Sequence, residues 1–261
     1  MFDLSSVFRF AALSGFVLAL LAGCGSEDAG SGGANPAPAP TATEPAAKPT
    51  PLKSDTPAGP KVAFVGDSIT AGLHLEFRDA FPSVVRETLR AAGIEFSIIN
   101  AGVSGDTTAG GVRRIDWILR QSPDLVVLEL GGNDGLRGVH LEDIERNLRA
   151  IVNAVNQAGG RTLLLGMRIP PSYGAEYSEG FSAIYERVAT EEESAELVPY
   201  FMEGVGGVPE MMLADGIHPT AEGHRKLAAT LAPFLTRALA GMGGSAVGST
   251  SGGGTAREQR P

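Results

Sequence analysis

The stretch KVAFVGDSITAG, residues 61–72, joins a short unbroken apolar run to a turn of small and polar residues. Strands that are covered on both faces read as near-continuous apolar runs, so the run at 62–65 favours a strand of a parallel sheet. The turn then places Ser68 between this strand and a helix, with its hydroxyl facing the open end of the sheet. A serine there needs a neighbouring base before it can act as a nucleophile. Thr70 stands where a G-x-S-x-G elbow needs its second glycine, so the α/β-hydrolase motif is absent.

Strand-like and helical segments alternate along the rest of the chain. Four further apolar runs follow the first, at 96–99, 125–130, 162–167 and 196–201. Helical segments separate them, at 79–92, 107–121, 141–158 and 178–192, and a last helix begins near Pro219. Pro233 is expected to kink or divide that last helix. The alternation predicts a three-layer α/β domain with a parallel sheet, whose ligands bind beyond the carboxyl ends of the strands.

The composition limits the classes of partner and of site. The chain has 261 residues, 43% of them hydrophobic, which is enough for a buried core, and its formal net charge is -9. So acidic a chain is a poor nucleic-acid binder, because it repels the phosphate backbone. The single cysteine, Cys24, excludes an intramolecular disulfide, a CxxC redox pair and a zinc site built from cysteines.

The two ends of the chain read as segments outside the folded domain. Arg9 precedes an apolar run at 10–21 that is too short to span a bilayer and fits a signal peptide. The Leu-Ala-Gly-Cys that ends at Cys24 resembles the bacterial lipobox, which implies cleavage before Cys24 and lipid attached to it; the alternative is an ordinary signal peptide with a chance cysteine. The expected organisation is a lipoprotein signal peptide at 1–23, the lipidated cysteine and a disordered Ala/Pro/Thr-rich tether at 24–60, the folded domain at 61–240, and a disordered Gly/Ser-rich tail at 241–261.

Polar residues follow the later apolar runs, where parallel strands end. Gly105 lies at the expected start of a helix and can turn its backbone N–H toward an anion. Asn133, between paired glycines and an Asp-Gly turn, can direct its amide at a developing oxyanion. Asp215 and His218 stand three residues apart, so the carboxylate can bind one ring nitrogen while the other acts as base toward Ser68.

Each of these features has a structural explanation when it is taken singly. A turn accounts for the glycines and for the Asn-Asp-Gly sequence. Of the other three histidines, His74 and His140 are expected to be structural, and His224, inside the last helix, is expected to be structural or exposed. Taken together, the loops supply a nucleophile, a base, an orienting acid and oxyanion donors, each near the carboxyl end of a strand. That coincidence favours an enzyme that uses a serine nucleophile.

These loops resemble the signature blocks of the SGNH (GDSL) hydrolase superfamily, and within it the bacterial periplasmic multifunctional acyl-CoA thioesterase, lysophospholipase and arylesterase family. The resemblance covers residues 61 to about 238. It rests on NAGVSGDT at 100–107, LELGGNDGLRG at 128–138, FSAIY at 181–185, FME at 201–203 and DGIHP at 215–219. Ile69 and Thr70 stand where leucine and serine are common in that family.

The resemblance implies a flavodoxin-like fold, with a five-stranded parallel sheet between helices, and a serine esterase that forms an acyl-enzyme. Ser68 would be the nucleophile, His218 the general base and Asp215 the residue that orients it. The oxyanion would be bound by the backbone N–H groups of Ser68 and Gly105 and by the Asn133 side chain. The family implies no metal and no organic cofactor.

The same resemblance implies small-molecule acyl esters or thioesters as substrates, lysophospholipids among them, in an acyl groove between the loop after Asn133 and the segment 168–177. With lipid on Cys24, the enzyme is expected to be exported, monomeric and anchored to a bacterial membrane facing the periplasm. Gly25 stands after Cys24 where an aspartate would retain a lipoprotein in the inner membrane, so the outer membrane is the expected destination.

Two alternatives stay open: a carbohydrate O-acetyl esterase on the same scaffold, and a lipid-tethered binding protein with a vestigial site. A nucleotide-binding protein is disfavoured, because neither G-x-G-x-x-G nor G-x-x-x-x-G-K-[ST] follows a strand.

Overall fold

The computed structural model describes residues 59–242, which contain one five-stranded sheet. The strands lie in the order β2-β1-β3-β4-β5, and every pair of neighbours is parallel. Their bounds are β1 (Lys61–Gly66), β2 (Ser97–Gly102), β3 (Leu125–Glu129), β4 (Arg161–Leu165) and β5 (Ala195–Val198). The predicted fold class, an α/β domain with five parallel strands, is confirmed.

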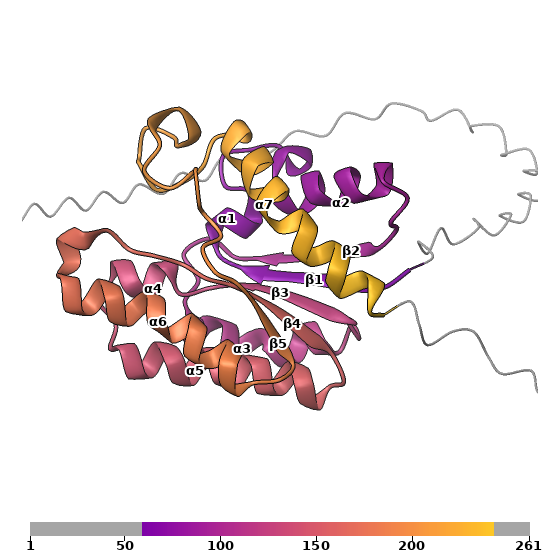
Figure 1. Cartoon of the computed structure of the whole chain (residues 1–261), viewed down its shortest axis with the longest axis horizontal. Coiled ribbons are helices and arrows are strands. Elements are labelled where there is room, and N and C mark those ends of the chain that lie inside the picture. Colours follow the sequence, from indigo (N-terminus) through magenta and orange to yellow (C-terminus); the bar gives the residue numbers. More distant parts are fainter. Residues whose placement is uncertain (1–58, 243–261) are drawn as a thin grey trace, which may run out of the picture. The chain divides into compact units, whose positions relative to one another are not determined.

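Helices cover both faces of this sheet (Figure 1). On one face α2 packs against α7, and on the other α3 packs against α5 and α5 against α6. The helices are α1 (Ser68–Ala71), α2 (Phe81–Ala91), α3 (Thr108–Leu119), α4 (Gly132–Leu136), α5 (Leu141–Gln157), α6 (Ala175–Glu191) and α7 (Ala221–Ala240), and short 3-10 helices lie at Phe77–Asp79, Pro171–Tyr173 and Pro209–Met211. Every segment with helical periodicity in the sequence therefore forms a helix, with its ends shifted by a few residues.

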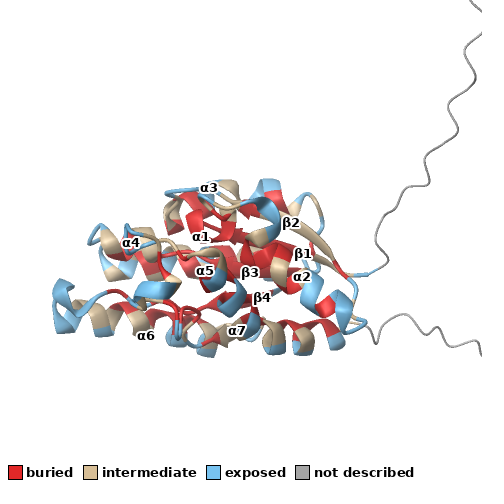
Figure 2. Cartoon of the chain, turned by 90° about the horizontal axis from the view of Figure 1, so that it is seen from above, coloured by how far each residue is buried: buried red, intermediate tan, exposed pale blue. Residues whose placement is uncertain are grey.

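The central strands are buried along almost their whole length (Figure 2). Every residue of β3 is buried, and in β1 only Lys61 is partly exposed. Side chains on both faces of these strands meet helices, which explains why their apolar runs are continuous rather than alternating. Truncating one fully buried leucine of such a core to alanine typically costs about 2–5 kcal/mol of stability.

The strand order reverses between β1 and β3, and loops of the predicted site meet at that point. From β1 the chain crosses to β2 on one side and then returns past β1 to β3 on the other. Loops that leave neighbouring strands in opposite directions open a crevice at the carboxyl ends of those strands. Ser68 follows β1 and Asn133 comes shortly after β3, and both line a pocket there.

Pro233 was expected to kink or divide the last helix, and it does not divide it. Helix α7 runs unbroken over Ala221–Ala240 with the proline inside it. Leu231 and Leu235, on either side of the proline, are both fully buried. Their packing maintains the helix although the proline cannot donate a backbone hydrogen bond.

Two predicted loops also differ locally from expectation. Gly105 does not begin a helix: it lies in a turn at φ 78°, a conformation that glycine adopts without strain. Helix α3 begins at Thr108, because the Thr107 side chain caps it by accepting the Gly110 N–H. Asn133 lies in the short helix α4 rather than in an irregular turn.

His224 has the structural role expected of it and connects α7 to α2. Its Nδ1 accepts the N–H of Phe81 at 3.0 Å, and its side chain is buried. Burial lowers the pKa of His224 to about 4, because the interior disfavours the charged imidazolium. The ring is therefore a neutral hydrogen-bond acceptor in the core.

The elements run from Lys61 to Ala240. The predicted signal peptide, tether and tail lie almost wholly outside the described residues, so Cys24 has no place in the structure described. Among residues 59–242, no helix is both long enough and apolar enough to cross a membrane. Over the same residues, His, Cys, Asp and Glu side chains do not gather in threes in a way that would hold a metal ion.

Candidate active site

Ser68 lies in the first turn of α1, where the chain leaves β1. Asp67 caps this helix, since its carboxylate accepts the N–H of Ile69 at 3.0 Å. Gly72 ends the helix in the left-handed region, at φ 71°. The short helix places Ser68, a residue that is 7% exposed, in the wall of a pocket at the carboxyl end of β1.

The structure brings Ser68, His218 and Asp215 together. The Oγ of Ser68 lies 2.9 Å from Nε2 of His218, although 150 residues separate them in sequence. Nδ1 of the same ring lies 2.7 Å from Oδ2 of Asp215. The other oxygen of Asp215 accepts the N–H groups of Ile217 and His218, at 2.9 and 3.0 Å, and so fixes the bend before α7.

These contacts determine which ring nitrogen carries the proton. The backbone N–H of His218, its ring and the backbone N–H of Ile217 hold the pKa of the Asp215 carboxyl well below its usual range. An ionised carboxylate only accepts hydrogen bonds, so the ring donates through Nδ1 and keeps a lone pair on Nε2. That lone pair faces the Ser68 hydroxyl, as general-base activation of a serine requires.

The predicted oxyanion donors line the same pocket. The Ser68 N–H is among the unpaired groups at the start of a helix, and the Gly105 N–H finds no acceptor among the described residues. Asn133 donates one N–H to Asp67 Oδ2 at 3.0 Å, which leaves its second N–H free. Arg137 connects the two loops, because its guanidinium lies 3.2 Å from the Gly105 carbonyl and 3.4 Å from the Asn133 side-chain oxygen.

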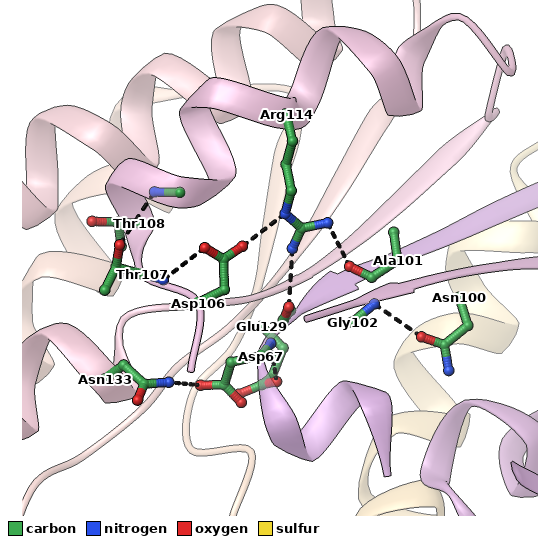
Figure 3. Close-up of polar contacts among 12 residues, drawn as sticks. Asp67, Asn100, Ala101, Gly102, Asp106, Thr107, Thr108, Arg114, Glu129 and Asn133 are labelled. Atoms are coloured by element: carbon green, nitrogen blue, oxygen red, sulfur yellow. Dashed lines mark hydrogen bonds and ion pairs between the residues drawn. The ribbon is translucent and has the colours of Figure 1, made fainter. Parts of the chain in front are cut away.

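A second arginine, Arg114 of α3, supports these loops from behind (Figure 3). It donates to the Asp106 carboxylate at 2.7 Å, to the Ala101 carbonyl at 2.6 Å and to the Gly66 carbonyl at 3.0 Å. Asp106 in turn accepts the N–H of Thr107 at 3.0 Å. One guanidinium thus fixes the ends of β1 and β2 relative to the loop that precedes α3.

The pocket beside Ser68 has a volume of about 740 Å³. Its apolar lining includes Leu73, Leu136, Met167, Ile169, Met202 and Met212. Arg168 is the one Lys or Arg among the described residues that line it, and its guanidinium stacks over the Tyr200 ring at 4.4 Å. A cavity of this size, largely apolar with a few polar groups at one end, suits a small ligand with an apolar chain.

The segment 168–177, predicted to border this groove, contributes only its first four residues to the lining. Further along, Tyr173 and Tyr177 line a separate and smaller hollow. Their hydroxyls donate to the carbonyls of Leu136 and Val139, at 3.0 and 2.6 Å. The two tyrosines therefore hold the end of α4 and the loop after it, and they do not line the larger pocket.

The sequence did not single out Glu129 or Arg114 near the site, and it did not predict that His74, expected to be structural, lies beside the catalytic-type histidine. His74 packs its ring edge-on against that of His218, with the ring centroids 6.0 Å apart. Glu129 is fully buried next to Asp67, and Arg114 supports the loops. A charged residue inside the apolar run at 125–130 was the available signal for Glu129, because glutamate is rarely buried without a partner. Nothing local marks His74 or Arg114, whose contacts join distant segments.

A parallel α/β domain with a hydrogen-bonded serine, histidine and aspartate at the wall of an apolar pocket defines a serine hydrolase. Residues 64–226 match the GDSL-like Lipase/Acylhydrolase family, and since this match spans more than half of the sequence, the chain belongs to that family. The resemblance to GDSL hydrolases that the sequence motifs predicted is confirmed. The protein is an ester-hydrolysing enzyme.

Similar proteins cover the same part of the chain. Esterase TesA of Pseudomonas aeruginosa is 42% identical over 185 residues, which are 70% of this chain and 92% of that protein. Thioesterase 1/protease 1/lysophospholipase L1 of Escherichia coli is 38% identical over 179 residues, 68% of this chain and 84% of that protein. A crystal structure of TesA, 42% identical, matches with a TM-score of 0.66 over 69% of this chain and 99% of its own.

Proposed function

We propose that Ser68 is the nucleophile of this esterase, that His218 is its general base, and that Asp215 orients the histidine. The observation that carries the proposal is the hydrogen-bonded series from Asp215 through His218 to Ser68, with contacts of 2.7 and 2.9 Å at a pocket wall. The proposed oxyanion hole consists of the backbone N–H groups of Ser68 and Gly105 and the side chain of Asn133. All three residues line the same pocket, which supports this assignment.

In the proposed reaction, Ser68 Oγ attacks the acyl carbonyl carbon while Nε2 of His218 takes the hydroxyl proton. The carbonyl oxygen becomes an oxyanion, and the donors of the oxyanion hole bind it. The imidazolium then gives its proton to the leaving alcohol or thiol, and an acyl-enzyme ester on Ser68 results. Water, deprotonated by the same imidazole, hydrolyses that ester and restores the serine.

The pocket lining favours substrates with an acyl chain longer than acetyl. Burying one methylene in an apolar site contributes about 0.8 kcal/mol, and an acetyl group would leave most of the roughly 740 Å³ unfilled. We therefore propose carboxylic acyl esters and thioesters as the substrate class. The names of two similar proteins, an esterase and a thioesterase/lysophospholipase, are in line with this choice.

A chain-length series is expected to show this preference directly. The kcat/KM for nitrophenyl esters should rise by up to about fourfold per added methylene from acetate upward, until the apolar pocket is filled. The measurement is initial-rate hydrolysis by the purified enzyme of nitrophenyl acetate through palmitate. A preference confined to acetate would contradict the acyl-groove assignment and favour the carbohydrate O-acetyl esterase. Acetylated xylan and peptidoglycan would then be the substrates to compare.

We further propose that the enzyme is exported and anchored to a bacterial membrane through lipid on Cys24, with residues 25–60 as the tether. The support is the lipobox-like tetrapeptide and the scarcity of large apolar residues in 25–60.

In bacteria fed a labelled palmitate analogue, the wild-type chain should take the label and sediment with membranes, whereas Cys24→Ala should do neither. An unlabelled wild-type chain in the soluble fraction would contradict the anchor and favour an ordinary signal peptide.

A further inference from the structure

Glu129 is a buried acid that the proposed reaction does not use. It is the last residue of β3, and none of its surface is exposed. Taking an ionised carboxylate out of water costs several kcal/mol, so a carboxyl group in such a place is either paired with a cation or protonated. Figure 3 shows Glu129 beside Asp67, whose carboxylate also contacts Asn133.

The backbone around Glu129 is shaped to admit its carboxyl group. Oε2 accepts the hydroxyl of Thr70 at 2.8 Å and the N–H of Asp67 at 3.4 Å. Gly66 makes room for this arrangement, since a Cβ there would lie 2.7 Å from Glu129 Oε2 and would also clash with the Thr70 hydroxyl. Oε1 has no hydrogen-bond donor among the described residues.

Glu129 and Asp67 lie side by side: Oε2 of Glu129 is 3.4 Å from the backbone nitrogen of Asp67, and Figure 3 shows the two carboxyl groups next to each other. Two ionised carboxylates repel at that range, so one proton must be shared by the pair unless a cation compensates them. No Lys or Arg among the described residues forms an ion pair with either acid. Arg114 is the cation of the neighbouring helix, and its ion pair is with Asp106.

The other groups that face the pair do not supply a fixed positive charge either. Burial raises the pKa of the Tyr185 hydroxyl of α6 well above its usual value, so the hydroxyl stays neutral and donates to the Leu130 carbonyl at 3.0 Å. His218 faces the pair from the loop before α7, and only in its protonated form would its charge lower the pKa of Asp67. The proposed reaction requires this histidine to be neutral at rest.

Asp67 is the member of the pair that better accommodates negative charge. Its carboxylate accepts the N–H of Ile69 and the amide of Asn133, each at 3.0 Å. Burial raises the pKa of Asp67, but these hydrogen bonds and the one from Glu129 oppose that rise. Burial first, and the charge of Asp67 second, raise the pKa of Glu129 well above its usual value. Glu129 therefore holds the proton.

We propose that Glu129 is a positioning residue for the oxyanion hole: it stays protonated, donates a hydrogen bond to the Asp67 carboxylate, and thereby fixes the acceptor that aims the Asn133 amide. The inference rests on the proposed role of Asn133 as an oxyanion donor. When Glu129 fixes the Asp67 carboxylate, that carboxylate holds the planar Asn133 amide in one orientation. Donors that are fixed before the reaction stabilise an oxyanion more, because they need no reorientation during it.

A double-mutant cycle on the full chain tests this coupling with a nitrophenyl ester as substrate. Asn133→Ala should lower kcat by about 10²–10³-fold, the usual loss for one oxyanion donor. Glu129→Leu, which cannot donate, should lower kcat by about tenfold or more with KM nearly unchanged. In the Asn133→Ala background, Glu129→Leu should have no further effect on kcat. Equal losses in the two backgrounds would mean that Glu129 only supports the fold, and would overturn the proposal.

Glu129→Gln is the matched variant, because its amide donates through N–H and accepts through oxygen but cannot ionise. It should recover most of the kcat that Glu129→Leu loses and stay within about fivefold of the wild type. Glu129→Gln can still contradict the proposal if Glu129→Leu does not fold. A Glu129→Gln enzyme with less than about a tenth of wild-type kcat would show that proton donation is not what Glu129 supplies.

Thermal unfolding at different pH values gives an independent measure of whether the Glu129 carboxyl group is protonated. Suppose that a carboxyl group is protonated in the folded protein and ionises in the unfolded protein. The folded protein then loses stability as the pH rises from the unfolded-state pKa of about 4.3 to the folded-state pKa. Below that range both states bind the proton. The Tm of the wild type should therefore fall increasingly behind that of Glu129→Gln as the pH is raised above about 4. A Tm difference that does not change with pH would mean that Glu129 is ionised in the folded protein, and would contradict the proposal.

The inference and the proposed function fail in different ways. If Asn133→Ala keeps the wild-type kcat, the oxyanion assignment is wrong and the role of Glu129 fails with it. If Asn133→Ala loses activity as expected while the effect of Glu129→Leu adds to it, only the role of Glu129 is wrong.

Discussion

Ser68→Ala is expected to lower kcat for nitrophenyl acyl esters by about 10⁴–10⁶-fold, the range found when the nucleophile of a serine triad is removed. Alanine has no atom that can form the ester bond to the acyl group. The His218 ring, whose Nε2 lies 2.9 Å from the serine oxygen, then has no hydroxyl proton to take. The expected loss is in kcat, measured at saturating substrate, and labelling by a fluorophosphonate probe gives a second readout.

Ser182→Ala is the matched control for this substitution. Ser182 lies on α6, its hydroxyl donates to the Ser178 carbonyl at 3.1 Å, and it does not line the pocket. This variant should keep wild-type turnover and full labelling, whereas Ser68→Ala should take no label. If Ser68→Ala retained more than about one hundredth of the wild-type kcat, or were still labelled, another residue would be the nucleophile.

The fold class could be predicted because burial leaves a direct mark on the sequence. Strands β1 and β3 meet helices on both faces, so the runs at 62–65 and 125–130 contain almost no polar residue. Helix ends were less predictable, because a side-chain cap decides them. Thr107 accepts the Gly110 N–H at 3.2 Å and begins α3, and the spacing of apolar residues does not reveal which polar residue will cap.

In the candidate site too, contacts between residues close in sequence could be predicted, and contacts between distant residues could not. Asp215 and His218 are three residues apart, so their pairing could be predicted from spacing alone. The setting of Glu129 depends on the register between β1 and β3, which places Gly66 opposite it. The contact of Glu129 with the Asp67 N–H joins residues 62 apart in sequence. No spacing pattern in one sequence encodes such a register, although a buried charge in an apolar run does indicate that some partner exists.

Asp215→Asn is expected to lower kcat by about 10³–10⁴-fold while the loop before α7 stays folded. The asparagine oxygen can accept the N–H groups of Ile217 and His218, as Oδ1 does at 2.9 and 3.0 Å. The amide nitrogen replaces Oδ2, which lies 2.7 Å from Nδ1 of His218, and presents a donor where an acceptor stood. The ring must then accept at Nδ1 and carry its proton on Nε2, so it cannot take the proton of Ser68.

Asp215→Ala separates catalysis from support of the loop, because it removes the acceptor for the backbone as well as the one for the ring. Both variants should show a low kcat and slow fluorophosphonate labelling of Ser68, since both lose the correctly oriented base. Only Asp215→Ala should also have a lower Tm, because Asp215→Asn keeps the backbone hydrogen bonds. The Asp215 side chain is 39% exposed, so water can compete for the ring nitrogen. If Asp215→Asn stayed within about tenfold of the wild-type kcat, water would suffice to orient the imidazole, and Asp215 would be a cap of this loop and not a member of the triad.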